Sequence, residues 1–183
     1  MIEAAAVAAL VEAASLDSDG QAGKSRELIL MLLAASPEPF SRFQFMPGHI
    51  TCTGLVVSPD ARRVLLVHHR RLDRWLLPGG HVEAEDAAIW EAARREVREE
   101  TGADLVPDAR PPLVSLDVHG IPAKGREPYH LHHDLIFLFR ARSEEVEISP
   151  ESRALTWCAP ADFDSYDVPG NVRRAWSRLP GQN

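Results

Sequence analysis

Residues 76–103 read LLPGGHVEAEDAAIWEAARREVREETGA. This stretch opens with a Pro-Gly-Gly turn, where glycine lets the backbone approach a ligand closely. The alanine-rich run that follows predicts a helix, which Asp86 can cap at its start and which Gly102 ends. The stretch therefore predicts a glycine-rich turn followed directly by a helix.

Three glutamates share one face of this predicted helix. Glu96, Glu99 and Glu100 are spaced i, i+3 and i+4, so their Cβ atoms lie within about 5–6 Å of one another, where like charges repel. A hard divalent cation, Mg²⁺ or Mn²⁺, would neutralise them, because it takes oxygen ligands and binds through carboxylates and substrate phosphates. The alternative is a solvated acidic face that neighbouring arginines partly neutralise.

The same residues resemble the Nudix box, G-x5-E-x7-R-E-U-x-E-E-x-G-U, in which U is a bulky apolar residue. Gly80 corresponds to the first glycine, and residues 95–103 correspond to the second half of the box. There are three departures: Asp86 replaces Glu, eight residues instead of seven precede Arg95, and Ala103 is small for the last U. The half that carries the metal carboxylates is intact, so the chain resembles a working Nudix hydrolase.

The resemblance extends along the chain, to a group of bacterial Nudix hydrolases of mostly unassigned substrate that have an N-terminal helical segment. It implies an α/β fold, the Nudix α/β/α sandwich with a mixed sheet. We expect a helical segment at residues 1–44 and the Nudix hydrolase domain at residues 45–183. The irregular order of strands and helices also favours a mixed sheet over a Rossmann fold.

The resemblance also implies a reaction. It is the metal-dependent hydrolysis of a phosphoanhydride bond in a nucleoside diphosphate linked to another group, such as a nucleotide sugar or ADP-ribose. One alternative is a pyrophosphohydrolase that acts on canonical or oxidised nucleoside triphosphates. Another is a ligand-sensing Nudix module without catalysis, although the intact glutamates argue against it.

The family's functional residues can be carried over to matching positions. Glu99 and Glu100 are expected to be the principal metal ligands, and Glu96 a third ligand or the acceptor of a proton from the attacking water. Gly80 is expected to offer its backbone carbonyl to the metal. Arg95 is expected to orient the carboxylates, unless it is only an exposed partner on the helix.

A further acid outside the box is common in the family, just before a tryptophan on a late strand. Glu151 precedes Trp157 by six positions and is our candidate for an additional catalytic or metal-binding carboxylate, with Glu127 as its rival. Either residue could instead be a plain surface carboxylate.

A histidine-rich stretch, YHLHHD at residues 129–134, supplies further candidates. On a strand, His130, His132 and Asp134 share one face because side chains alternate. A His-x-His pair could bind zinc, but we favour a face that lines the substrate cleft, with packed or solvated histidines as the alternative. The candidate substrate-binding residues are Gly79, Gly80, His81, His132 and Tyr129, with His49 near the same cleft and with Phe45 and Trp75 as further rings that could stack on a base.

Composition bounds the partners. The 183 residues carry a net charge of −7, which argues against a general binder of nucleic acid or anionic membranes. We expect a small nucleotide substrate that is bound together with Mg²⁺ or Mn²⁺. Two cysteines in strand-like runs do not make a disulfide framework, so we expect core thiols and a cytoplasmic protein.

The remaining elements follow from local patterns. Helices are expected at 1–14 and about 25–35, joined by a polar linker at 16–23. The second helix is apolar nearly all round and must be buried, against the catalytic domain or in a homodimer. Strands are expected at 49–57 and 63–69, as a hairpin, and at 74–77, 111–119, 131–141 and 154–159, before a short helix from 160 and a last helix at 171–179.

Overall fold

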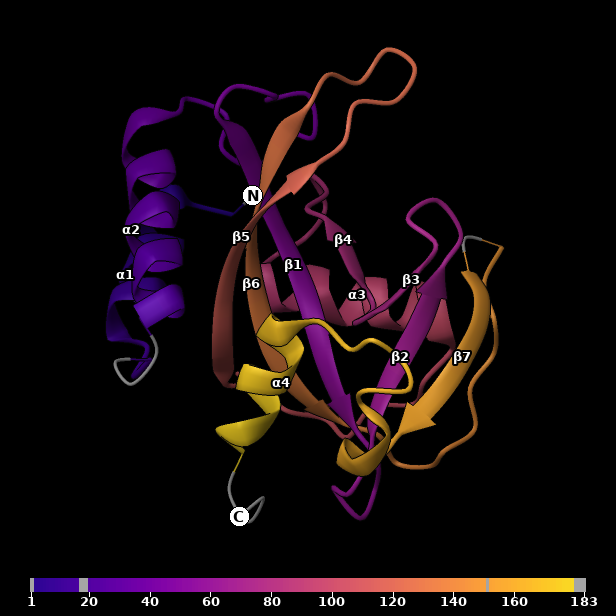
Figure 1. Cartoon of the computed structure of the whole chain (residues 1–183). Coiled ribbons are helices and arrows are strands. Elements are labelled where there is room, and N and C mark those ends of the chain that lie inside the picture. The colour runs from indigo at the N-terminus through magenta and orange to yellow at the C-terminus, as the bar shows by residue number, and fades with distance from the viewer. Residues whose placement is uncertain (1, 17–19, 151, 180–183) are drawn as a thin grey trace.

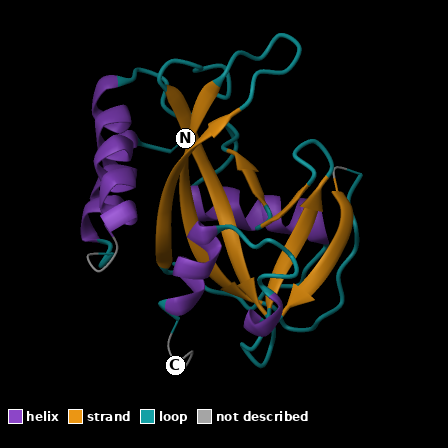
Figure 2. Cartoon of the chain, viewed as in Figure 1, coloured by secondary structure: helices purple, strands orange, loops and turns teal. Residues whose placement is uncertain are grey.

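The computed structural model describes residues 2–16, 20–150 and 152–179. Figure 1 and Figure 2 show a strongly curved sheet with helices around it. In chain order the elements are α1 (Ala4–Ala13), α2 (Gly20–Ala35), β1 (Gly48–Val57), β2 (Val64–His69), β3 (Arg74–Leu76), β4 (Gly79–His81), α3 (Ile89–Thr101), β5 (Leu113–Ile121), β6 (His130–Arg140), β7 (Ser152–Cys158), the 3-10 helix η1 (Pro160–Asp162) and α4 (Gly170–Ser177).

The sheet is mixed, as the sequence predicted. Its central path runs β3-β2-β1-β6-β5, while β4 pairs with β1 and β7 pairs with β2. Strands β1 and β6 are parallel over ten residue pairs, and the other pairings are antiparallel. Strands and helices do not alternate regularly along the chain, and only one pair of the described strands is parallel. This arrangement differs from a Rossmann fold, in which helices connect parallel strands.

The predicted hairpin at 49–69 exists only at its closed end. Strands β1 and β2 are antiparallel but pair only at Val57 and Val64, and then diverge like the arms of a V (Figure 1). On the open side β1 pairs with β4 instead. The divergence leaves this edge of β1 free to pair with β4, which carries the glycine turn.

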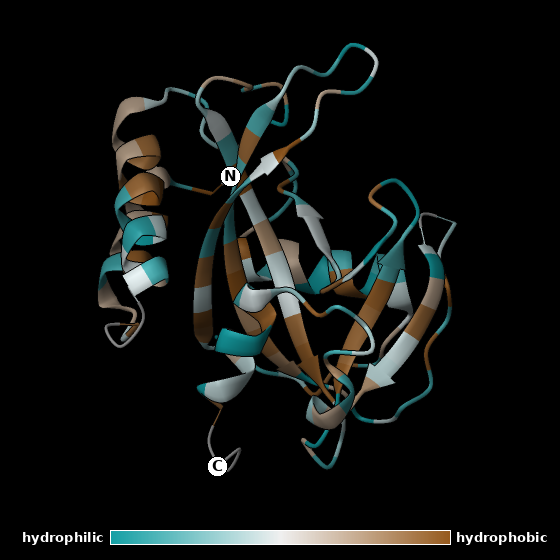
Figure 3. Cartoon of the chain, viewed as in Figure 1, coloured by the Kyte–Doolittle hydropathy of each residue, from teal (hydrophilic) through white to brown (hydrophobic). Residues whose placement is uncertain are grey.

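Side-chain alternation along β1 separates two cores. The even residues Ile50, Cys52 and Val56 are buried in a core that α1, α2 and α3 cover. The odd residues Leu55 and Val57 belong to a second core, which η1 and α4 cover on the other face. Together the layers form the predicted α/β/α sandwich. Figure 3 shows the closed end of β1 as a continuous hydrophobic run.

The N-terminal helices pack against the rest of the domain. Helix α2 lies against α1 and β5, and it buries Ile29, Leu32 and Leu33. The expectation that this helix is buried is therefore confirmed for one side of α2, whereas Leu28 is 42% and Met31 is 65% exposed. The predicted linker also ends early, since α2 begins at Gly20; residues 17–19 lie outside the described part of the chain.

Both cysteines are buried free thiols, as predicted. Burial raises the pKa of the Cys52 thiol well above its usual value, and burial raises the pKa of Cys158 to about 11. Neither thiol is therefore ionised near pH 7. Among the described residues, no helix combines the length and the apolar character needed to cross a membrane.

The contact between α3 and β1 leaves no room for a side chain at Gly54. A Cβ there would overlap Cγ2 of Val97 and press on the Phe139 ring. We predict that Gly54→Ala lowers the free energy of unfolding by about 1–3 kcal/mol through overpacking. Gly23 in α2 has open space around it, so Gly23→Ala should raise the free energy of unfolding by about 0.5–1 kcal/mol. Urea denaturation measures both, and equal midpoints for the two variants would contradict the packing of α3 on β1.

Candidate active site

A cleft of about 620 Å³ occupies the open side of the V. The glycines of β4, the glutamate face of α3 and polar residues of β1, β5 and β6 line it. The cleft therefore brings together the glycine turn, the three glutamates and part of the histidine-rich stretch, which are far apart in the sequence.

The glycine turn meets the helix directly. The backbone N–H of Gly79 donates to Oε2 of Glu100 at 3.1 Å. A Cβ at Gly80 would lie 2.6 Å from Oε2 of Glu96, so any larger residue would displace this carboxylate. The close backbone approach that the turn predicted is therefore an approach to the helix carboxylates.

The prediction that Asp86 caps the start of α3 is wrong. The helix begins at Ile89, and its N-cap, Ala88, makes no side-chain capping hydrogen bond. Asp86 lies before the helix, where its carboxylate accepts the Glu83 N–H at 2.8 Å and pairs with Arg95. The helix does end at Gly102, which adopts a left-handed conformation with φ 62°, as predicted.

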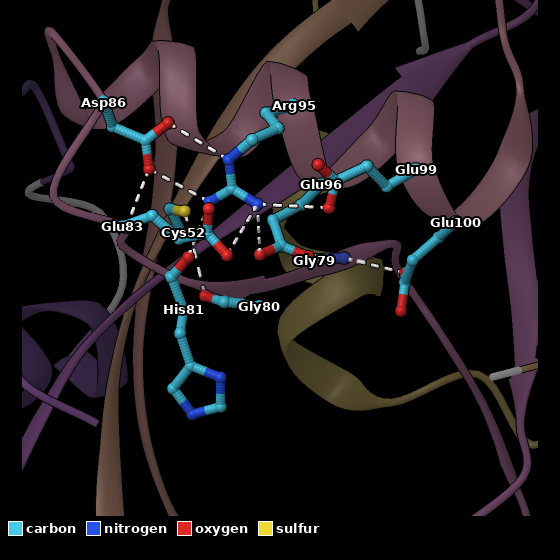
Figure 4. Close-up of polar contacts among 10 residues, drawn as sticks. All are labelled: Cys52, Gly79, Gly80, His81, Glu83, Asp86, Arg95, Glu96, Glu99 and Glu100. Carbon is cyan, nitrogen blue, oxygen red and sulfur yellow. Dashed lines mark hydrogen bonds and ion pairs between the residues drawn. The ribbon is translucent and has the colours of Figure 1, made fainter. Parts of the chain in front are cut away.

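Arg95 is the centre of the polar network in Figure 4. Its Nε donates to Oδ1 of Asp86 at 3.1 Å and its Nη2 to Oδ2 at 2.9 Å, which is a two-pronged ion pair. Nη2 also donates to the His81 carbonyl at 2.9 Å. The contact between Asp86 and Arg95 is therefore bidentate, with the shorter acid and with eight residues between the two.

The other arm of Arg95 holds two of the glutamates. Nη1 donates to Oε1 of Glu96 at 2.9 Å and to Oε2 of Glu99 at 3.2 Å. The hydrogen bonds to Asp86 raise the pKa of Arg95, so the guanidinium is always charged. Arg95 thus links the loop before α3 to the carboxylates, and its orienting role stays a prediction.

The glutamates offer a set of oxygen donors to the cleft. Glu100 is 6% exposed, whereas Glu99 projects into solvent. Burial raises the pKa of Glu96, and Arg95 opposes this shift only in part. An added positive charge would stabilise the carboxylate form. Oxygen donors and unbalanced negative charge are what a hard divalent cation requires, so the residues present fit Mg²⁺ or Mn²⁺.

Histidines from three strands form a second polar cluster at this cleft. The ring centroids of His49 and His132 are 4.8 Å apart, those of His49 and His81 5.0 Å, and those of His81 and His132 5.4 Å. Burial lowers the pKa of His132 to about 2 and that of His81 to about 4, and it also lowers the pKa of His49. The three imidazoles are therefore neutral near pH 7.

Asp134 has a different place from the one that a zinc site with His130 and His132 would need. Its Oδ1 accepts hydrogen bonds from Thr51 at 3.0 Å and from Thr53 at 2.8 Å, across the β1–β6 pair. Burial raises the pKa of this carboxyl. Asp134 thus links β6 to β1 at the wall of the cleft, while the His132 ring lies beside those of His49 and His81.

Several predicted residues lie apart from these two clusters. Tyr129 packs beside Gly120 and is 61% exposed to solvent. Glu127 forms an ion pair with Arg71 at 2.7 Å. The Arg71 hydrogen bond lowers the pKa of Glu127. Glu151 lies outside the described residues. Of the two other rings, Trp75 contacts His68 and Tyr166, and Phe45 contacts His130 edge-on.

Sequence reasoning missed other residues of the cleft. Thr51 and Thr53 line it, and the alternation of polar residues at 49, 51 and 53 within an apolar strand was the signal that could have indicated them. Positive side chains also line the cleft, from connections that carry no motif: Arg42, Arg70, Arg71 and Lys124.

The Arg95 network gives a stability prediction. Arg95→Gln should lower the free energy of unfolding by about 1–3 kcal/mol, because Asp86 would stay buried without its charged partner. Arg98 is exposed on the same helix, so Arg98→Gln should change the free energy of unfolding by less than about 0.5 kcal/mol. Denaturant unfolding of both variants measures the difference, and similar values would mean that the network does not hold this loop to α3.

Comparisons with known proteins agree with this geometry. The NUDIX domain model matches residues 48–176. The nucleoside triphosphatase NudI from Escherichia coli is 36% identical over 110 residues, which are 59% of this chain and 77% of NudI. A putative 8-oxo-dGTP diphosphatase from Bacillus subtilis is 29% identical over 120 residues, 66% of this chain and 73% of that protein.

A solved structure shows the same fold. The MutT NUDIX hydrolase from Burkholderia pseudomallei has a TM-score of 0.54 and 26% identity, covering 71% of this chain and 96% of that one. The family model spans well over half of the chain and includes the glycine turn, α3 and the histidine strands. The resemblance found in residues 80–103 is therefore confirmed, and the chain belongs to the Nudix family of hydrolases.

Proposed function

We propose that the protein hydrolyses a phosphoanhydride bond of a nucleoside polyphosphate or its derivative, with Mg²⁺ as cofactor and Mn²⁺ as a possible substitute. The observation that carries this proposal is the convergence of Glu96, Glu99 and Glu100 with the Gly79–Gly80 turn on one cleft. The glutamates offer carboxylate oxygens to a cation, and the glycine backbone next to them leaves room for a phosphate chain.

Glu99 and Glu100 would hold the cation, with the Gly80 carbonyl as a further donor. Bound there, it would supply a water molecule of lowered pKa and would neutralise phosphate oxygens. Glu96 would be the third ligand or the acceptor of the proton of the attacking water, because its carboxylate lines the same cleft. Arg95 is a positioning residue, because it contacts Glu96 and Glu99.

Positive side chains at the cleft suit a polyphosphate. Arg42, Arg71 and Lys124 line the same cleft as the glutamates, so phosphate groups bound there could contact both the cation and these residues. Neutral His81 and His132 on the cleft wall could contact the sugar or base. Tyr129 stays a predicted substrate contact only if its hairpin moves toward the cleft when substrate binds.

Two substrate classes remain in the proposal. The sequence favoured a nucleoside diphosphate linked to another group, such as a nucleotide sugar or ADP-ribose. Two relatives, a nucleoside triphosphatase and a putative 8-oxo-dGTP diphosphatase, favour a nucleoside triphosphate. The number of cationic side chains at the cleft also suits the more highly charged triphosphate, which we therefore place first.

The remaining predictions concern the setting of the protein. We propose that residues 45–183 act as the hydrolase domain in the cytoplasm, in keeping with two reduced, buried thiols. Exposed Leu28 and Met31 leave the homodimer a prediction that a solution mass measurement can test.

A substrate panel tests the proposed reaction. Purified protein and Mg²⁺ are incubated with nucleoside triphosphates, 8-oxo-dGTP, nucleotide sugars and ADP-ribose, and the products are identified by mass. A nucleoside monophosphate with pyrophosphate is expected from a triphosphate, and a nucleoside monophosphate with a phosphorylated partner from a diphosphate derivative. Tight binding of a panel member without turnover would instead support the sensing module.

Variants on α3 test the roles of the glutamates. Glu99→Gln should lower turnover of the panel substrate in Mg²⁺ by at least about 100-fold, because the cation contributes several kcal/mol to the transition state. Glu91→Gln is the matched control, since Glu91 lies on the same helix and pairs with Arg94 at 2.6 Å. Unchanged turnover in Glu99→Gln would contradict the assignment.

A further inference from the structure

We propose that His49, His81 and His132 form a binding site for a borderline transition-metal cation, with Zn²⁺ as the first candidate. The site is distinct from the oxygen site on α3 and does not depend on the reaction proposed above. One nitrogen of each imidazole can serve as ligand, and the three ligand atoms lie within 4.8 Å of one another. Imidazole nitrogen suits Zn²⁺, whereas carboxylate oxygen suits Mg²⁺.

The sheet register creates this cluster. In the parallel β1–β6 pair, His49 lies opposite His132, and in the antiparallel β1–β4 pair, His81 lies opposite Thr51, two residues beyond His49. Residues that are paired or diagonal across strands project from the same face. Three strands thus deliver three imidazoles to one place, on backbone that hydrogen bonds already hold. In Figure 4 the His81 ring points away from the Arg95 network, which keeps the two sites apart.

Hydrogen bonding fixes which atom of His49 is available. Its Nδ1 lies 3.2 Å from the Gln44 carbonyl oxygen, which can only accept, so Nδ1 carries the proton of the neutral ring. Nε2 therefore has a free lone pair. It is buried, and no hydrogen-bond partner reaches it within the described part of the chain. A backbone carbonyl that orients an imidazole through its other nitrogen is the usual second partner of a metal-bound histidine.

This protonation state favours a cation over an anion. A phosphate oxygen is an acceptor, and Nε2 of neutral His49 is an acceptor as well, so the two cannot share a hydrogen bond. A metal ion would satisfy the lone pair, which otherwise carries the desolvation cost of an unpaired buried group. The predicted cleft-lining role of His132 is compatible with this site, since His81 and His132 line the cleft while His49 is fully buried.

Only small movements separate the cluster from a bound geometry. Nitrogen ligands at about 2.0–2.1 Å from a tetrahedral Zn²⁺ lie about 3.3 Å apart. Rotation of the partly exposed His81 and His132 rings toward His49 would bring the ligand atoms from within 4.8 Å to that separation. Three protein ligands leave a fourth position, which would open toward the cleft and could take water or a phosphate oxygen.

Cobalt binding tests the site, because Co²⁺ reports a four- or five-coordinate nitrogen environment by its visible absorption. The full chain is freed of metal with a chelator, the chelator is removed, and Co²⁺ is added while the spectrum is recorded; Zn²⁺ then displaces it. We expect one equivalent with visible bands in the wild type and in Glu96→Gln/Glu99→Gln, where the oxygen site is weakened. His49→Gln should bind Zn²⁺ at least about 100-fold more weakly.

Two further variants keep the test decisive. His68 lies on β2 beside Trp75, outside the cluster, so His68→Gln should bind like the wild type. His81 is partly exposed, so His81→Gln replaces His49→Gln if the latter fails to fold. Absence of the visible bands in the wild type, their loss in Glu96→Gln/Glu99→Gln, or equal Zn²⁺ affinity in His81→Gln and His68→Gln would overturn the proposal. Turnover with Mg²⁺ is measured separately and decides only the proposed function.

Discussion

Mutual repulsion of Glu96, Glu99 and Glu100 on one face of α3 is the constraint on which the rest of the site depends. In the protein, Arg95 contacts two of these carboxylates and is itself anchored by Asp86 and the His81 carbonyl. One guanidinium cannot balance three glutamates and an aspartate. Arg95 therefore holds the glutamate face of α3 in position but leaves it with a net negative charge. A net negative charge on oxygen donors favours the binding of a divalent cation.

The divergence of β1 and β2 gives this face its cleft. If the two strands paired along their whole length, the sheet would close over the glycine turn. Because they pair only at Val57 and Val64, β4 can take the vacant edge of β1 and place Gly79 and Gly80 against the glutamates. The odd-numbered residues of β1 share one face of the strand: Thr51 and Thr53 line the cleft, and Leu55 and Val57 lie in the core under α4.

Local patterns predicted most of this arrangement. The i, i+3, i+4 spacing placed the glutamates on one face, and the residue types at 80–103 indicated the family and its sandwich fold, because helix periodicity and a long motif are properties of adjacent residues. Asp86 was misassigned as a helix cap for the same reason. Its partner is Arg95, nine residues further along the chain on α3. In a sequence, an aspartate that caps a helix cannot be told from one that forms an ion pair.

Features that depend on register were beyond such reasoning. Whether His132 would face His49, or Asp134 would bond to threonines of β1, is decided by how β1 and β6 align, and no local pattern specifies that alignment. Likewise, the apolar character of α2 did not reveal which of its faces meets α1 and β5 and which remains exposed.

Anomalous diffraction from crystals soaked in Mn²⁺ tests the central claim most directly, because Mn²⁺ replaces Mg²⁺ at oxygen sites and can be located by its own signal. The account predicts a peak in contact with the carboxylates of Glu99 and Glu100 and with the Gly80 carbonyl, while Arg95 keeps its pair with Asp86. A Mn²⁺ ion bound elsewhere, with the glutamate face of α3 left to Arg95 alone, would contradict it.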